Sequence, residues 1–257
     1  MAESGKHIYF LSDLHLGVPD HQSSLVRELK LVHWLDSIKN QAAEIFLMGD
    51  IFDFWFEYKT VVPKGFVRLL GKLAEITDSG IPVHVFRGNH DIWAFDYLEK
   101  EVGVKLYRKP ISRTFSGKKF YLAHGDGLGP GDTGYKMLKK VFENRFNQWL
   151  FKWLHPDVGT RLGLYFSHKS RIANVAREQK NDFKIVPEKE MLYHYCQSIL
   201  ANDSSYDYFI FGHRHIPLDF SLNEKARLII LGDWVTNFTY AVFDGNRLEL
   251  KFLKDTK

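Results

Sequence analysis

The feature that most constrains this chain is an apolar run of strand length that ends at Gly49-Asp50. A buried strand that stops at Gly-Asp delivers the carboxylate to the carboxyl edge of a sheet, where open α/β sheets hold their ligands. Four further stretches carry Asp, His or Asn in the same way: Ser12-Asp13-Leu14-His15, Arg87-Gly88-Asn89-His90-Asp91, Ala123-His124-Gly125-Asp126 and Phe211-Gly212-His213-Arg214-His215. The sequence therefore predicts an α/β fold with a two-metal site in which Asp50 lies between the ions.

Hydrophobic periodicity predicts how the remaining elements alternate along the chain. Strands are expected at 7–11, 81–86, 119–123 and 208–211, and helices at 25–38, 66–77 and 188–199. Residues 104–118 are predicted to be irregular or a hairpin. Residues 227–231 and 239–243 are predicted to close a second sheet, and Asp244-Gly245 predicts a hairpin turn after them. Asp13 and His15 are expected on one side of an extended segment, since alternate residues of a strand share a face.

Composition narrows the class of protein without giving its chemistry. A net charge of +4 is a mild excess that suits an anionic substrate or an anionic lipid surface. The only cysteine, Cys196, excludes an internal disulfide and fits a reducing compartment. The N-terminal residues reach a predicted strand without a signal-peptide core, and no apolar run approaches the ~20 residues of a membrane span. The chain is therefore predicted to be cytoplasmic and either soluble or peripheral.

Residues 135–180 differ in character from the rest of the chain. Two helical stretches, 135–155 and 159–179, combine aromatic residues such as Trp149 and Trp153 with lysine and arginine. This segment is predicted to be a helical cap inserted into a single domain that spans residues 1–257. Two alternatives remain open for its apolar face, which either packs on the body or receives acyl chains and meets a membrane surface.

The donor set of the predicted site limits the metals that it can hold. Carboxylate, imidazole and amide oxygen without thiolate suit two divalent ions, with Mn²⁺ the most natural and Fe, Zn or Mg as alternatives. Two ions about 3.5–4 Å apart can activate a water and clamp a phosphate oxygen together.

The five stretches, in this order, resemble the calcineurin-like metallophosphoesterase superfamily, whose pattern is D-x-H, G-D, G-N-H-D/E, H and G-H-x-H. The resemblance implies a four-layer αββα sandwich of two mixed sheets with the inserted cap. It also implies two sets of ligands that share one carboxylate. The first ion would be held by Asp13, His15, Asp50 and His215, and the second by Asp50, Asn89, His124 and His213.

A narrower resemblance covers most of the chain. The run Gly49-Asp50-Ile51-Phe52-Asp53-Phe54-Trp55, the cap after His124-Gly125-Asp126 and the stretch Leu231-Gly232-Asp233-Trp234 are similar to the UDP-2,3-diacylglucosamine pyrophosphatases of lipid A synthesis. That similarity implies water attack on the UDP α-phosphate, release of UMP and 2,3-diacylglucosamine 1-phosphate, and a cap that takes two acyl chains. It further implies a nucleotide-linked glycolipid substrate and a peripheral location on the cytoplasmic face of the inner membrane. By the same resemblance Asp132 and Tyr135 match a D-x-x-Y segment that follows the histidine loop in the family, and both are candidates for binding substrate, with Asp132 contacting the sugar. Lys169 and Arg171 are candidates for the phosphate.

The third motif departs from this narrower family, which usually carries Arg where this chain has His90. Asn89, His90 and Asp91 are the candidate catalytic residues, with His90 stabilising developing charge or protonating a leaving group. Asp91 is predicted to hydrogen-bond His90 and to hold its orientation. His90 also permits a phosphodiesterase or phosphatase acting on another substrate, and a third reading is a non-catalytic scaffold of the same fold. Nucleic acid is not expected as a partner, because the positive charges are interleaved with acids.

Overall fold

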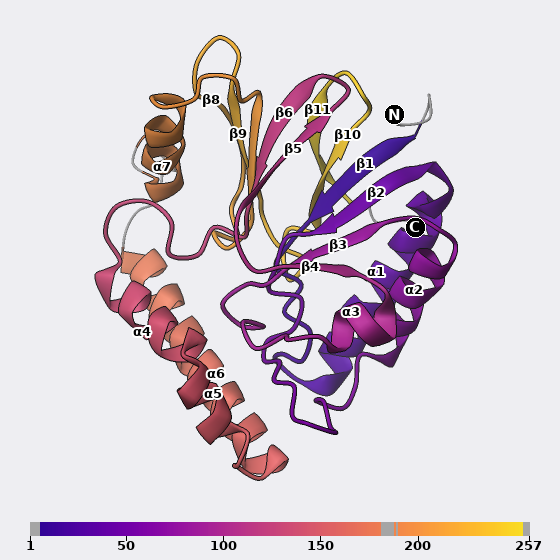
Figure 1. Ribbon diagram of the computed structural model, residues 1–257, viewed down its shortest axis with the longest axis vertical. Coiled ribbons are helices and arrows are strands. Elements are labelled where there is room, and N and C mark those ends of the chain that lie inside the picture. The colour runs from indigo at the N-terminus through magenta and orange to yellow at the C-terminus, as the bar shows by residue number, and fades with distance from the viewer. Residues whose placement is uncertain (1–5, 181–187, 189, 254–257) are drawn as a thin grey trace.

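Two β-sheets stack face to face, and helices cover the outer face of each sheet (Figure 1). The computed structural model describes residues 6–180, 188 and 190–253, and only the backbone of 170–180. Helices lie on both outer sides of the sheet pair. The predicted four-layer αββα sandwich of two mixed sheets is therefore confirmed.

The first sheet has six strands, four of them parallel. In spatial order they are β11 (Leu248–Phe252), β10 (Thr239–Phe243), β1 (His7–Leu11), β2 (Ala42–Leu47), β3 (Val83–Phe86) and β4 (Lys105–Tyr107). The helices on its outer face are α1 (His21–Ile38), α2 (Val67–Asp78) and α3 (Tyr97–Val102), with the short 3₁₀ turn η1 (Lys39–Gln41) after α1. The helices expected at 25–38 and 66–77 are confirmed within a few residues.

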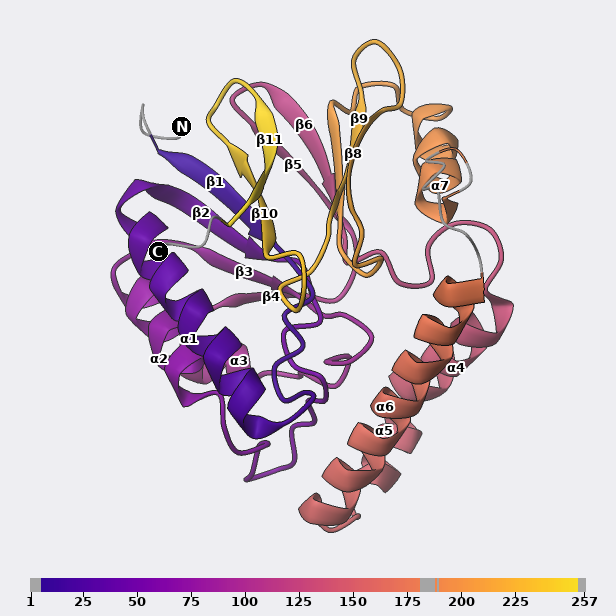
Figure 2. The ribbon, with the colours of Figure 1, turned by 180° about the vertical axis from the view of Figure 1, so that it is seen from behind.

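The second sheet has five strands and is covered by one helix. In spatial order the strands are β5 (Ile111–Phe115), β6 (Lys118–Leu122), β7 (Tyr208–Phe211), β9 (Arg227–Leu231) and β8 (Pro217–Ser221), and the helix is α7 (Met191–Leu200). In this sheet β7 runs parallel to both β6 and β9. Figure 2 shows α7 on the side of this sheet that faces away from the first one.

Two predicted strand pairings are wrong. Residues 239–243 form β10 in the first sheet, where they pair with β1, and only 227–231 belong to the second sheet. Residues 104–118 do not form a hairpin of their own, because β4 pairs with β3 while β5 pairs with β6 in the other sheet. Apolar runs of this length are equally suited to either sheet, so the sequence pattern cannot assign the partner. The hairpin at Asp244-Gly245 is confirmed and joins β10 to β11.

The space between the sheets is filled by aromatic rings. Phe10 is fully buried, with its ring 5.0 Å from that of Phe46 on the neighbouring strand and 6.1 Å from that of Phe120 in the other sheet. Further large side chains of this layer, among them Phe243 and Phe86, are also buried. This layer fixes the distance between the two sheets and hence between the loops at their edges.

Three helices between β6 and α7 form a separate layer that we call the cap helices. They are α4 (Thr133–Glu143), α5 (Arg145–Phe151) and α6 (Pro156–Lys180). The sequence predicts two helices over this stretch, and the structure has three. The break comes at Asn144, whose extended backbone ends α4 and whose side chain accepts the N–H groups of Phe146 and Asn147 at the start of α5.

We predict that Phe10→Ala lowers the free energy of unfolding by about 3–5 kcal/mol, since a buried aromatic side chain and its contacts in both sheets are lost. Urea denaturation measures the change. Phe252→Ala is the matched control, because Phe252 is 58% exposed on the edge strand β11 and should change stability by no more than about 0.5 kcal/mol. Equal effects of the two substitutions would contradict the proposed role of the ring layer.

Candidate metal centre

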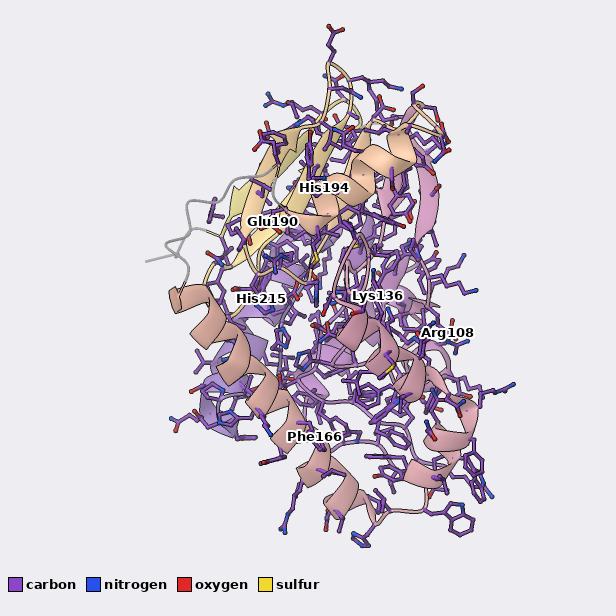
Figure 3. The ribbon with its side chains drawn as sticks, turned by 90° about the vertical axis from the view of Figure 1, so that its left-hand side faces the viewer. Arg108, Lys136, Phe166, Glu190, His194 and His215 are labelled. Atoms are coloured by element: carbon purple, nitrogen blue, oxygen red, sulfur yellow. The ribbon has the colours of Figure 1, made fainter. Side chains whose placement is uncertain are left out.

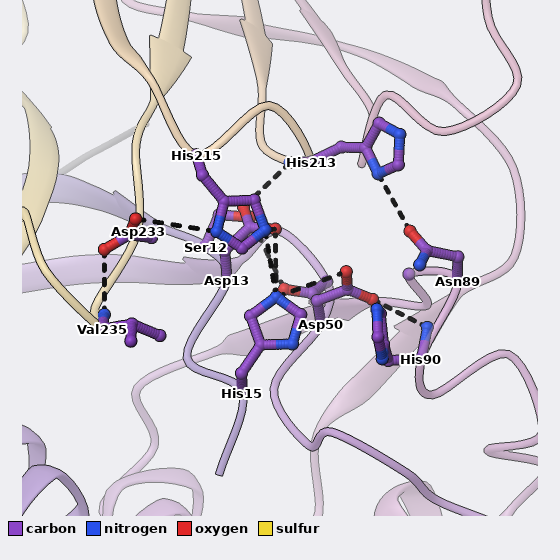
Figure 4. A network of polar contacts seen from close by, with 12 residues as sticks. Ser12, Asp13, His15, Asp50, Asn89, His90, His213, His215, Asp233 and Val235 are labelled. Atoms are coloured by element: carbon purple, nitrogen blue, oxygen red, sulfur yellow. Dashed lines mark hydrogen bonds and ion pairs between the residues drawn. The ribbon is translucent and has the colours of Figure 1, made fainter. Parts of the chain in front are cut away.

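Five loops that follow strands of both sheets meet at one edge of the sandwich. The loops after β1, β2 and β3 come from the first sheet and carry Asp13 and His15, Asp50, and Asn89 respectively. The loops after β6 and β7 come from the second sheet and carry His124 and the pair His213 and His215. The structure brings together all seven predicted ligand residues, and Figure 4 shows most of them.

One group of donors lies around His15. Its Nε2 atom is 3.2 Å from His215 Nε2, 3.8 Å from Asp13 Oδ1 and 3.7 Å from Asp50 Oδ2. Asp13 Oδ1 is also 3.5 Å from His215 Nε2. His15, Asp13 and Asp50 are each at most 1% exposed, whereas the His215 side chain is 41% exposed and so opens this group to solvent.

A second group lies around Asn89. Its Oδ1 atom is 2.9 Å from His213 Nδ1 and 3.3 Å from His124 Nε2. The same His124 Nε2 is 3.4 Å from Asp50 Oδ2, so one oxygen of Asp50 is near the nitrogens of both groups. Asp50 is the residue that joins the two groups.

The donors fit divalent metal ions. Asp13 Oδ1 is buried without a hydrogen-bond partner, an arrangement that is costly unless another group satisfies the oxygen. His15 and His215 turn the same ring nitrogen toward each other, as two ligands of one ion would. Ligand atoms within 4.8 Å of one another occur in the sets Asp13, His15, His215 and Asp50, His124, His213, and also in His15, Asp53, His90. Oxygen and imidazole donors without thiolate suit Mn, Fe, Zn or Mg.

The backbone at the ligands is strained. Asp13, His15, Asp50, His213 and His215 have φ angles between 41° and 67°, and they are five of the nine non-glycine residues with positive φ in the described part of the chain. Such conformations cost on the order of 1–3 kcal/mol each and cluster at functional sites. The expectation that Asp13 and His15 lie on one extended segment is therefore wrong. They converge because each takes a left-handed turn that no hydrophobic pattern predicts.

Two glycines allow the loops to approach each other closely. A Cβ at Gly88 would overlap Asp50 Oδ1, and a Cβ at Gly49 would overlap the His124 ring. Gly49 also has φ of 105°, a conformation that glycine adopts without steric cost. The G-D and G-N motifs therefore carry glycine because the neighbouring ligand occupies the space of a side chain.

The buried charges set opposite protonation states at neighbouring ligands. Burial alone would raise the pKa of Asp50, but the His124, His90 and His15 imidazoles hold it well below its usual range. Burial would lower the pKa of His124, yet Asp50 raises it to about 10, whereas burial and the neighbouring His124 lower the pKa of His213 to about 3. His213 is therefore neutral, as a metal ligand would need to be, while His124 would have to release a proton in order to bind an ion.

Three buried carboxylates that sequence reasoning did not select support the ligands. Asp53 Oδ1 is 3.4 Å from His15 Nδ1, and Asp233 Oδ2 is 3.6 Å from His215 Nδ1. Asp126 follows His124 by two residues and accepts the Tyr135 hydroxyl at 2.5 Å. Carboxylates behind ligating histidines fix the tautomer and the ring orientation. All three stand in stretches that carry the family resemblances, but aspartate is too common in loops for the sequence alone to assign them this role.

The predicted hydrogen bond between Asp91 and His90 is wrong. Asp91 is 2% exposed, and its two oxygens accept the backbone N–H groups of Gly88 at 2.6 Å and Ile51 at 2.8 Å. Asp91 therefore fixes the loops rather than the imidazole. His90 Nδ1 instead lies 2.9 Å from the Asp53 carbonyl oxygen and 3.2 Å from Ser167 Oγ. The backbone N–H of His90 donates to Asp50 Oδ1.

The predicted substrate-binding residues lie on the cap helices or at their start. Asp132 is exposed at the N-cap of α4 with φ of 47°, and Tyr135 is turned toward Asp126 with its ring 6.4 Å from that of His213. Lys169 is exposed on α6, and the side chain of Arg171 lies outside the described residues. Figure 3 shows His215 between α6 and α4, with the labelled Lys136 on α4 and Phe166 on α6. Of the four, only Tyr135 has a described contact with the ligand residues.

Several known proteins resemble this chain. The profile for the calcineurin-like phosphoesterases matches residues 6–217. A UDP-2,3-diacylglucosamine hydrolase of Porphyromonas gingivalis is 40% identical over 96% of this chain and 98% of its own length. A protein of the same name from Haemophilus influenzae strain Rd is 30% identical over 97% of this chain and all of its own. Among solved structures, a dimetal phosphatase from Danio rerio superposes with a TM-score of 0.48 at 14% identity, covering 97% of this chain and 96% of its own.

We predict that Asp233→Asn weakens binding of divalent metal about 10-fold, since His215 loses the carboxylate that orients its ring. Calorimetric titration of metal-free protein with Mn²⁺ measures the affinity. Asp244→Asn is the matched control, because Asp244 likewise accepts backbone N–H groups in a turn but lies next to no histidine ligand in the described structure. Unchanged affinity in Asp233→Asn would contradict the role assigned to this carboxylate.

Proposed function

We infer that this chain, which belongs to the calcineurin-like phosphoesterase family, is a metal-dependent hydrolase that cleaves the pyrophosphate of UDP-2,3-diacylglucosamine and releases UMP and 2,3-diacylglucosamine 1-phosphate. Three independent features support the substrate: the full-length similarity to proteins named for it, the two groups of metal donors, and the apolar surface of the cap helices. The metal donors support the class of reaction, and the cap helices support the identity of the substrate.

Two divalent ions, Mn²⁺ by preference, are proposed to occupy the centre. We assign Asp13, His15, Asp50 and His215 to one ion and Asp50, Asn89, His124 and His213 to the other. When bound, such a pair activates a water molecule and neutralises charge on a phosphate oxygen. The donors already stand in two groups that share one oxygen of Asp50, and this arrangement supports the assignment.

His90 is proposed to act on the phosphate through Nε2. A carbonyl oxygen cannot donate a hydrogen bond, so the 2.9 Å contact with Asp53 O makes Nδ1 the donor. The other nitrogen then remains for the substrate. The His90 ring also lies edge-on to His15 at 4.7 Å between centroids, which places it beside the first group of donors. As an imidazolium, His90 would stabilise charge on a phosphate oxygen, the role expected of the arginine that the family resemblance implies at this position. Asp132 remains our candidate for the sugar, and Lys169 and Arg171 for the phosphate.

The cap helices expose a large apolar surface, which supports a lipid substrate. Thirteen of the seventeen large apolar side chains that are exposed in the described part of the chain lie between residues 137 and 166. They include Trp153 at 75% exposed, Phe146 at 64% and Phe166 at 57%. An exposed apolar surface of this extent on a soluble domain marks a binding site for an apolar ligand or for a membrane. Between the two alternatives that the sequence left open, this surface favours acyl chains over packing on the body.

Peripheral attachment to the cytoplasmic face of a membrane is part of the proposal. Among the described helices, none combines the length and the apolar character that spanning a bilayer requires. Lys136, Lys140 and Lys152 are interspersed along the sequence with the exposed apolar side chains of α4 and α5, a combination typical of helices that lie on anionic lipid.

The test of the function is release of UMP from UDP-2,3-diacylglucosamine by Mn²⁺-loaded protein, compared with hydrolysis of bis(p-nitrophenyl) phosphate. We expect rapid UMP release and slow cleavage of the aryl diester. Asp50→Asn should reduce both activities at least 100-fold, since a neutral side chain is a poor bridge between two cations. Rapid cleavage of the aryl diester without UMP release would retain the metal centre and assign the protein to the phosphodiesterases or phosphatases. No turnover of either compound by metal-loaded protein would favour a scaffold.

The lipid role of the cap predicts a selective defect. Trp153→Glu should raise KM for the diacyl substrate about 10-fold, because a charge replaces apolar surface that would contact an acyl chain, and should leave the aryl diester unaffected. Phe252→Glu is the control and should change neither, since Phe252 is an aromatic residue that is 58% exposed on β11, away from the cap helices. Equal effects of Trp153→Glu on both substrates would contradict acyl binding by the cap.

A further inference from the structure

The inner face of α6 is lined by small residues, one helical turn apart. Gly159, Gly163 and Ser167 are spaced by four residues and therefore lie on one face of the helix. A Cβ at Gly163 would overlap the ring of Phe54, and one at Gly159 would overlap the hydroxyl of Tyr58. The helix thus approaches the loop after β2 as closely as its backbone allows, while its large apolar residues, such as Leu162 and Phe166, remain exposed.

This close approach brings Ser167 to the metal centre. Ser167 is 8% exposed, and its hydroxyl donates to Asp53 Oδ2 at 2.7 Å. With its hydrogen committed to a carboxylate, Oγ can only accept from His90 Nδ1, which lies 3.2 Å away. His90 Nδ1 is thereby surrounded by three oxygens: Asp53 O at 2.9 Å, Ser167 Oγ at 3.2 Å and Asp53 Oδ1 at 3.5 Å.

We propose that Ser167 is a positioning residue for His90: from α6 it accepts the Nδ1–H of the imidazole and so directs Nε2 to the substrate, where Nε2 donates to a phosphate oxygen once it carries a proton as well. The proposal rests on the proposed function, because it assigns His90 a part in the reaction. Ser167 and Asp53 thus orient the imidazole of His90, the role that the sequence predicts for Asp91. The orientation of His90 depends on α6 being seated on the loop after β2, and the cap therefore completes the reaction site as well as binding substrate.

The kinetic test is a double-mutant cycle on UDP-2,3-diacylglucosamine with the full-length, Mn²⁺-loaded protein. Ser167→Ala should lower kcat about 10-fold and leave KM and metal content unchanged, because a partner that orients a catalytic group is lost while the substrate and the ions keep their contacts. In a His90→Ala background, the same substitution should change kcat less than 2-fold, since the imidazole that it positions is gone. Ser37→Ala is the matched control, because the Ser37 hydroxyl is helical and bonds only within α1 among the described contacts.

Several outcomes would overturn the proposal. A further 10-fold loss of kcat in the double variant would show that Ser167 acts independently of His90. An effect on KM alone would indicate that Ser167 contacts the substrate or supports the cap. Loss of metal would indicate that Ser167 acts through Asp53 and His15. If wild-type protein releases no UMP, the proposed function fails, and the following measurement still tests the positioning.

That measurement is long-range ¹H–¹⁵N correlation of the histidine rings in metal-free protein, with His90 assigned from the spectrum of His90→Ala. We expect the Nδ1–H pattern for His90 in the wild type and its loss, or averaging between the two tautomers, in Ser167→Ala. An Nε2–H pattern in the wild type, or an identical His90 pattern in Ser167→Ala, would overturn the assignment.

Discussion

The carboxylate of Asp50 is the group on which the rest of this site depends. It is 1% exposed, so the cost of removing a charge from water must be met by neighbouring partners. His15 and His124 approach the same oxygen from opposite sheets, and the backbone N–H of His90 donates to the other oxygen. Bound cations would compensate the charge further. Neither sheet alone provides these partners, and the ring layer around Phe10 therefore contributes to the chemistry by fixing how the two sheet edges meet.

The ligand loops hold conformations that the stability of the sandwich must sustain. Five ligands with left-handed backbone, at about 1–3 kcal/mol each, represent a cost comparable to the net stability of a domain. The loops are fixed from behind by carboxylates that accept backbone N–H groups: Asp91 from two and Asp233 from three. Such residues position the donors before any ion arrives, as pre-organised sites require.

The cap helices attach to the body next to both groups of donors. Tyr135 and Lys139 of α4 bond Asp126, which follows His124, whereas Ser167 of α6 bonds Asp53, which lies behind His15 and His90. Phe151 of α5 packs between these attachments against Phe56 and Trp93. The segment that carries the apolar surface is therefore in direct contact with the residues that orient the metal donors. A substrate that spans the cap and the centre would contact both.

The sequence by itself determined the α/β class, most strands and helices, and which side chains gather at the edge of the sheets. An apolar run that ends at Asp, His or Asn predicts a strand and also identifies the side chain at its end. It did not determine that β10 belongs to the first sheet, that the cap has three helices, or that Asp53 and Ser167 rather than Asp91 hold His90. Strand partners, left-handed turns and carboxylates behind a histidine depend on contacts between segments far apart in the chain, such as Asp53 and Ser167. Only the tertiary structure could decide them, since local patterns carry no information about which distant segment fills a given space.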